Sequence, residues 1–257
     1  MSDKAKSRLM IAGAALCAAL FLFSGAMLAR EYLDQKQSAE AFAEVADLIK
    51  EDVEPPTLEL ADDPAPKPEE LTAFEKYADV YAQNSDLVGW ISIPGTCVDY
   101  PVLQSSADDP EYYLRRTYKG EWRTAGSIFF QWDCSAESQN TVVYGHNMND
   151  GTMFAVLQKM ADEAFRNEHS KILLQTSNGL REYQIAAVLK TDITKLRFNR
   201  TEFADHADFL SFQKELFAQS LYESQTIPGE DCRLLTLVTC SYEWENARTV
   251  VIAAEVR

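Results

Sequence analysis

The longest apolar segment lies near the N-terminus, where residues 9–29 (LMIAGAALCAALFLFSGAMLA) carry no charge. About 20 apolar residues span a bilayer as a helix, so this segment predicts a transmembrane anchor. Basic residues dominate positions 1–8, which predicts a cytoplasmic N-terminus and an extracytoplasmic remainder. A cleaved signal peptide is the alternative, but the apolar run is longer than the core of most signal peptides.

A polar and acidic segment follows, covering residues 30–70. Its first half has helical composition, whereas residues 55–70 (PPTLELADDPAPKPEE) are rich in proline and acidic side chains. Such a sequence cannot bury enough apolar surface to fold alone, so we expect a solvated stalk. The predicted organisation is a basic cytoplasmic tail, an anchor, this stalk, and a folded domain over 71–257.

Within 71–257, short β-prone runs alternate with turn residues such as Pro94-Gly95 and Asn178-Gly179. Strands are expected at 87–93, 98–103, 126–131, 140–146, 171–176, 181–191, 232–240 and 248–256. So many short strands in one domain predict a mostly β fold, with the strands forming a closed or nearly closed barrel.

Helical periodicity precedes the strands at one place and interrupts them at two others, and we expect these three segments to be peripheral helices. The first begins near Thr72, and the others cover 152–165 and 207–224. The last of these carries an apolar stripe that predicts packing against the core. The stripe consists of Phe209, Phe212, Leu216 and Leu221.

Charge and motif content exclude several functions. The net charge of −16 argues against nucleic acid as a partner, because phosphate binding needs clustered Lys and Arg. The sequence contains no Walker A or GxGxxG loop, so no nucleotide cofactor is expected. Three histidines without metal-ligand spacing predict no metal site.

Four cysteines follow the anchor. Cys97, Cys134 and Cys232 are interpreted as small buried side chains, although their pairing cannot be deduced from sequence. Cys240 ends the apolar run LTLVT, where the chain turns polar. From this pattern alone it could be a buried side chain, half of a disulfide or a nucleophile.

The candidate chemistry lies at strand ends. His169 and His206 occur in charged segments and are expected at the surface, whereas His146 closes a predicted strand. Cys240 closes another strand, and Arg248 opens the next one. A thiolate nucleophile, an imidazole that exchanges protons and a guanidinium that stabilises an oxyanion together suit acyl transfer.

These residues resemble the motifs of class B sortases. The TLxTC signature is similar to Thr236–Cys240, with Arg248 on the following strand, and YGHN matches residues 144–147. The segment 87–104 resembles the family's opening strands, and the helix at 207–224 resembles a class B feature. Val238 stands where several class B enzymes have serine, so the choice of substrate motif is open.

The resemblance implies an eight-stranded sortase β-barrel with peripheral helices and a single membrane anchor. Cys240 would attack a C-terminal sorting motif of a secreted protein and form a thioester acyl-enzyme. His146 would be the general acid/base, and Arg248 would stabilise the oxyanion or the substrate. The acyl acceptor would be an amine, from a cell-wall precursor or a pilin lysine, at the surface of a Gram-positive-type bacterium. No cofactor is implied.

Two other functions are compatible with the same residues. An extracytoplasmic cysteine protease would pass through the same thioester and release it to water. A non-enzymatic surface module would have an unreactive Cys240 and no use for His146 and Arg248.

Overall fold

The computed structural model describes residues 3–48, 77–222, 232–241 and 243–256. The chain divides into two compact units, residues 1–41 and 42–257. The second unit contains the barrel and every predicted site residue. The predicted start of the domain at residue 71, and of its first helix at Thr72, lies outside the described residues.

The N-terminal helix α1 (Asp3–Leu48) contains the predicted anchor and continues into the predicted stalk. Its part from Ala12 to Val45 is long and apolar enough to cross a membrane, by length and composition. The helix continues past residue 29 because no proline or glycine follows before Leu48 to interrupt it. The helix is consistent with a membrane anchor.

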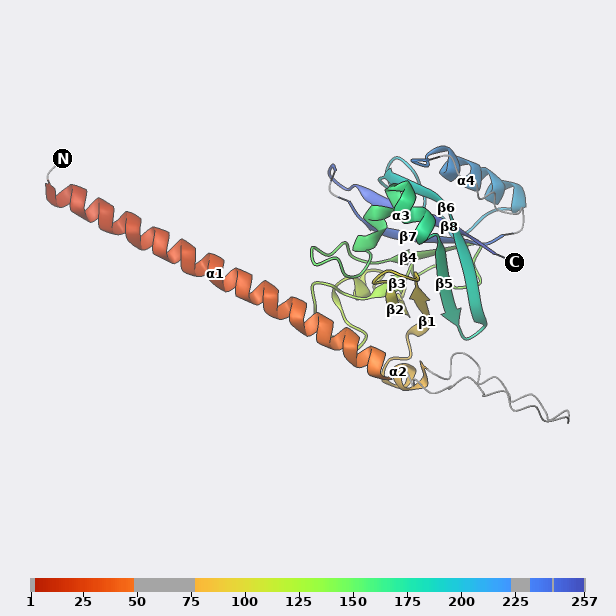
Figure 1. Cartoon of the computed structure of the whole chain (residues 1–257), viewed down its shortest axis with the longest axis horizontal. Helices are drawn as coiled ribbons and strands as arrows, with labels where there is room; N and C mark the ends of the chain where they lie inside the picture. The colour runs from red at the N-terminus through yellow and green to blue at the C-terminus, as the bar shows by residue number, and fades with distance from the viewer. Residues whose placement is uncertain (1–2, 49–76, 223–231, 242, 257) are drawn as a thin grey trace. The chain divides into compact units, whose positions relative to one another are not determined.

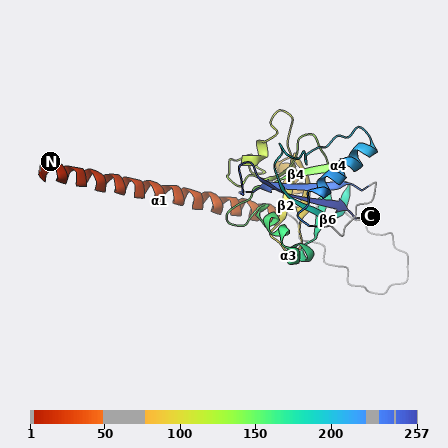
Figure 2. The same cartoon turned by 90° about the horizontal axis from the view of Figure 1, so that it is seen from above.

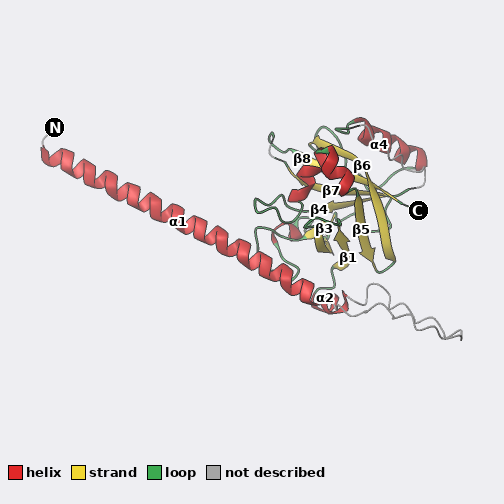
Figure 3. Ribbon diagram, viewed as in Figure 1, coloured by secondary structure: helices red, strands yellow, loops and turns green. Residues whose placement is uncertain are grey.

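The described part of the second unit contains eight strands that close into a barrel, as predicted (Figures 1 and 3). The order around the barrel is β1-β2-β3-β4-β7-β8-β6-β5. The strands are β1 (Leu87–Ser92), β2 (Asp99–Gln104), β3 (Ile128–Phe130), β4 (Asn140–Tyr144), β5 (Lys171–Thr176), β6 (Gly179–Thr191), β7 (Leu234–Cys240) and β8 (Arg248–Glu255). Two neighbouring pairs, β2–β3 and β4–β7, are parallel, and the others are antiparallel.

Strands β7 and β8 form the centre of the fold. Nearly every residue of both strands is buried, including Leu235, Thr236 and Leu237 in β7. Burial on both faces of a strand gives a nearly continuous apolar run rather than strict alternation. The ends of these two strands are consequently held by a rigid framework.

The helical elements lie outside the barrel, and Figures 1 and 2 show α3 and α4 there. The elements are α2 (Ala78–Gln83), the 3₁₀ helices η2 (Tyr112–Arg115) and η3 (Ala155–Ala161), α3 (Glu163–Glu168) and α4 (His206–Ala218). The single helix expected at 152–165 is divided, because Asp162 accepts a hydrogen bond from the Phe165 N–H and begins a new helix. The sequence did not predict η2.

The apolar stripe of α4 is confirmed for three of its four members. Phe209, Phe212 and Leu216 are buried in the core. Leu221 is 51% exposed, contrary to expectation, because α4 ends at Ala218 and the stripe ends with it. Among the described residues of the connection between β6 and β7, α4 therefore packs on the barrel core through these three side chains.

Candidate active site

The pairing of β4 with β7 brings His146 and Cys240 to one end of the barrel. The strands are parallel, with Tyr144 opposite Val238. The Gly145 N–H donates to the Val238 carbonyl at 3.1 Å, so the ladder continues up to the residue before His146. Because the two strands run the same way, His146 and Cys240 follow their paired residues at the same edge.

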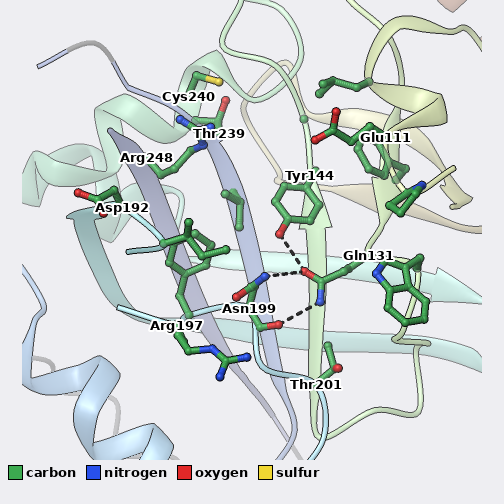
Figure 4. A pocket seen from close by; sticks show the side chains of 18 of the residues that line it. Glu111, Gln131, Tyr144, Asp192, Arg197, Asn199, Thr201, Thr239, Cys240 and Arg248 are labelled. Carbon is green, nitrogen blue, oxygen red and sulfur yellow. Dashed lines mark hydrogen bonds between the residues drawn. The ribbon is translucent and has the colours of Figure 1, made fainter. Parts of the chain in front are cut away.

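The antiparallel pair β7–β8 adds Arg248, which lies directly opposite Cys240 in the register. His146, Cys240 and Arg248 all line one cavity of about 880 Å³. Figure 4 shows Cys240 and Arg248 together at one end of this cavity. The structure therefore brings together all three predicted site residues through strand pairing, although His146 precedes Cys240 by 94 positions in the sequence.

A glycine before the histidine is required by packing. A Cβ atom at Gly145 would lie 2.4 Å from Ile128 Cδ1 and 2.7 Å from Phe154 Cδ2. These distances are shorter than any ordinary contact, and both neighbours are buried. Gly145 thus lets the chain pass beneath two core side chains immediately before it presents His146.

The His146 ring is oriented by a backbone carbonyl. Its Nε2–H donates to the Leu114 oxygen at 2.7 Å, and Leu114 belongs to η2. This bond leaves Nδ1 as the nitrogen that can accept a proton. Burial lowers the pKa of His146 below 6.5, the Leu114 bond opposes this shift, and Arg115 adds to it. The imidazole is therefore neutral at neutral pH.

Cys240 is a free, partly exposed cysteine at the end of β7. Its carbonyl oxygen accepts two side-chain hydrogen bonds, from Asn147 Nδ2 at 3.0 Å and from Gln158 Nε2 at 2.9 Å. The main chain of Cys240 is consequently bound to the loop after His146 and to η3.

Arg248 keeps its charge available to the cavity. Its Nη1 donates to the Ala247 carbonyl at 2.9 Å, and no ion pair joins it to a carboxylate among the described residues. Asp192 lines the same cavity, but its carboxylate is bound by Thr194 and Lys195 of its own loop. The hydrogen bond from the Thr194 hydroxyl, more than Lys195, lowers the pKa of Asp192 to about 2.

The other end of the cavity is lined by a polar network centred on Gln131 (Figure 4). Its Oε1 accepts from the Tyr144 hydroxyl at 2.8 Å and from Asn199 Nδ2 at 3.2 Å. Its Nε2 donates to the Asn199 carbonyl at 3.0 Å and to Asp133 Oδ1 at 2.7 Å. Burial raises the pKa of Tyr144 to about 12, so the hydroxyl stays protonated and donates. The cavity thus has Cys240 and Arg248 at one end and a network of hydrogen-bonded polar side chains at the other.

The remaining cysteines divide into two groups, and all are free. Cys134 and Cys232 are buried, as predicted, and burial raises the pKa of Cys134 to about 12. Cys97 is exposed, which corrects the prediction that it is buried. It lies in the connection between β1 and β2, outside the core, and its thiol donates to the Gly151 carbonyl at 3.2 Å.

The two other histidines lie away from the cavity. His206 is exposed, as predicted. His169 was expected at the surface, but its side chain is only 10% exposed. Its ring packs against Phe165 with centroids 4.4 Å apart, and Nδ1 donates to the Pro94 carbonyl at 3.0 Å. In the described part of the chain, no three His, Cys, Asp or Glu side chains gather as a metal site would require.

Sequence reasoning missed two contributors to the site. The Leu114 carbonyl orients His146 through its main chain, which carries no side-chain signal. Gln158 lies in the segment predicted as a helix at 152–165, and nothing in its pattern distinguished it from a surface glutamine. Gln158 and Leu114 belong to 3₁₀ helices that are far from Cys240 in sequence and reach the site only through the fold.

Comparison with known proteins identifies this arrangement. Residues 91–256 match the sortase domain family. The chain belongs to the sortase family. It is 38% identical to sortase B of Listeria monocytogenes over 182 residues, which cover 69% of this chain and 72% of the relative. Sortase B of Staphylococcus aureus is 33% identical over 176 residues, covering 67% and 71%.

Solved structures agree with these relatives. A crystal structure of Bacillus anthracis sortase B superposes with a TM-score of 0.74 at 28% identity, and the match covers 88% of this chain and 99% of the other. The chain is therefore a class B sortase, and its activity is that of a cysteine transpeptidase. The family acts outside the cytoplasm, and the apolar α1 is consistent with a membrane anchor.

Proposed function

We propose that Cys240 is the nucleophile of this sortase, His146 its general acid/base and Arg248 its oxyanion donor. The observation that carries the assignment is the register of β4, β7 and β8, which places all three residues on one cavity. Residues 9–29 would anchor the chain once in the membrane, with the N-terminus in the cytoplasm. Residues 30–70 would be the stalk, and 71–257 the extracellular catalytic domain.

The first half-reaction transfers an acyl group to sulfur. The proton of the Cys240 thiol passes to Nδ1 of neutral His146, and the sulfur attacks a backbone carbonyl of the sorting motif. The Arg248 guanidinium donates N–H bonds to the developing oxyanion. The peptide C–N bond breaks, His146 returns the proton to the leaving amine, and a thioester remains on Cys240.

The second half-reaction forms a new amide. An amine of a cell-wall precursor or of a pilin lysine attacks the thioester, the C–S bond breaks, and the amine proton returns through His146 to the thiolate. Because His146 is held neutral by burial, it can accept the first proton without an external base. Water in place of the amine would make the enzyme a hydrolase.

The test is Cys240→Ala in the full-length protein, assayed with a library of secreted-protein C-terminal peptides, with and without triglycine as an added amine. We expect the substitution to reduce acyl transfer by roughly 10⁴-fold or more, as removal of a covalent nucleophile does. The wild type should yield a triglycine adduct in preference to the free acid. Activity retained by Cys240→Ala would refute the assignment, and free acid alone would favour a protease.

A further inference from the structure

Two carboxamide side chains from different elements converge on the carbonyl oxygen of Cys240. Asn147 Nδ2 lies 3.0 Å from this oxygen and Gln158 Nε2 lies 2.9 Å from it. Asn147 follows His146 directly, whereas Gln158 belongs to η3. Both side chains are partly buried, as are the two hydrogen bonds. The two lone pairs of one carbonyl are thus both engaged by side chains at the position proposed to carry the nucleophile.

Gln158 also binds on its acceptor side. Its Oε1 accepts from the Thr249 hydroxyl at 2.9 Å and from Lys190 Nζ at 3.2 Å. Thr249 is fully buried and follows Arg248 in β8. A single glutamine therefore connects the main chain of Cys240 to the residue next to Arg248.

Asn147 makes the corresponding connection to the histidine. The His146 carbonyl accepts from the Phe154 N–H at 2.9 Å, and an isolated bridge pairs Asn147 with Met153. The loop that carries His146 is thereby closed on itself by backbone pairing. The Asn147 carboxamide ties this loop to β7 through its hydrogen bond to the Cys240 carbonyl.

We propose that Asn147 and Gln158 are positioning residues that fix Cys240 relative to His146 and Arg248 through the Cys240 carbonyl. The inference rests on the proposed roles of those three residues. Proton transfer and attack demand close alignment, and displacements of about 1 Å can cost about 100-fold in rate. Neither carboxamide touches the reacting atoms; each acts by holding the strand that carries the sulfur.

The test measures the thiol directly. Full-length protein in detergent is treated with iodoacetamide from pH 5 to 10, and alkylation of each cysteine is followed by peptide mapping. Exposed Cys97 is followed in every sample, and it is the internal reference for Gln158→Met, since its thiol binds Gly151 in the loop that carries Asn147. For Asn147→Ala and for Gln158→Met we expect Cys240 alkylation at pH 7 to slow roughly three- to tenfold, as for loss of one neutral hydrogen bond. In Gln158→Met, Cys97 alkylation should keep its wild-type rate.

Gln158→Glu separates positioning from stability. The carboxylate can still accept from Thr249 and pair with Lys190, but it cannot donate to the Cys240 carbonyl. We expect it to melt like the wild type and to alkylate as slowly as Gln158→Met. Wild-type alkylation by Gln158→Glu would show that the N–H bond has no role and would overturn the proposal for Gln158.

Asn178→Ala is the matched control, since Asn178 Nδ2 binds Glu137 Oε1 at 2.8 Å in another part of the barrel surface. It should leave the Cys240 profile unchanged, and a slowing there would mean that any lost carboxamide has this effect. Wild-type Cys240 profiles in both Asn147→Ala and Gln158→Met would overturn the positioning role. If Cys240→Ala is inactive in the same preparations, the nucleophile assignment stands apart from that failure.

Discussion

The two ends of the β7–β8 hairpin carry arginines in opposite situations. At the end where β7 begins, Arg233 pairs with Glu137 at 3.0 Å and with Glu255 at 3.5 Å. Arg181 joins the same carboxylates from β6. At the end where β7 finishes, Arg248 lies opposite Cys240 and pairs with no carboxylate of the described residues. The same two strands thus present a neutralised cluster at one end and a free cation at the other.

The difference separates charge used for the protein from charge kept for a ligand. Partly exposed ion pairs such as that of Arg233 contribute about 0–1 kcal/mol to stability. An arginine that lines a cavity and has no carboxylate partner gains no ion-pair contribution to stability. Such a cation suits a site where negative charge develops during the reaction. The most effective test of this comparison is to make the same substitution at each end.

The largest expected effect is that of Arg248→Lys. An ammonium cannot reproduce the two-pronged donation of a guanidinium, so we expect transpeptidation to fall about 100-fold or more. Arg233→Lys, at the opposite end, should keep wild-type turnover and change the free energy of unfolding by less than about 1 kcal/mol. Steady-state kinetics and thermal melts measure both, and equal losses of activity would remove the distinction between the two ends.

The sequence predicted the two strands of this hairpin more accurately than the segments around them. The β-prone runs LTLVT and TVVIAAEV predicted β7 and β8 nearly to the residue, because short runs rich in apolar and β-branched residues, bounded by polar segments, are typical of buried strands. Cys240, His146 and Arg248 could be chosen because their residue types and strand-end positions suit acyl transfer. Their presence on one cavity is a matter of strand order, which periodicity does not encode.

The parts that escaped prediction are irregular or act through the main chain. The 3₁₀ helix η2 has no apolar period, yet its Leu114 carbonyl orients His146. Cys97 was assigned to the core because cysteines usually are buried, but a turn between two strands placed it outside. Local pattern therefore predicted the barrel, and contacts between segments distant in sequence decided the lining of the site.

A glycine at each end allows a second matched comparison, with a smaller effect. Gly126 has φ +59°, and an added Cβ would lie 2.4 Å from the Leu114 carbonyl oxygen. Gly179, the first residue of β6, has φ +109° and no atom within 4 Å of such a Cβ. Both alanine variants pay for backbone strain of about 1–3 kcal/mol. Only Gly126→Ala should displace Leu114, and we expect about tenfold lower turnover in addition.

Kinetics and urea unfolding of the two glycine variants decide the matter. Gly179→Ala should lose stability and retain its turnover. If Gly126→Ala destabilised the protein but turned over like the wild type, the orientation of His146 by Leu114 would not matter for catalysis. A shift in the pH profile of Gly126→Ala would add direct support, since the Leu114 bond favours the protonated ring.

The smallest expected effect is a difference between the two ends in how stability depends on pH. Burial lowers the pKa of His146 below 6.5, so the unfolded chain binds a proton that the folded protein resists. Stability from this group is complete above about pH 6.5 and is lost as the pH falls below it. Hydrogen bonding from Asn178, then from Arg181, lowers the pKa of Glu137 below 4.5, so its contribution is lost only below that pH. Melting curves from pH 8 to 2 should show that His146→Gln removes pH dependence below about pH 6.5 and that Glu137→Gln removes it below about pH 4.5. A His146→Gln variant that tracks the wild type between pH 7.5 and 5.5 would mean that burial does not lower the pKa of the imidazole in the folded protein.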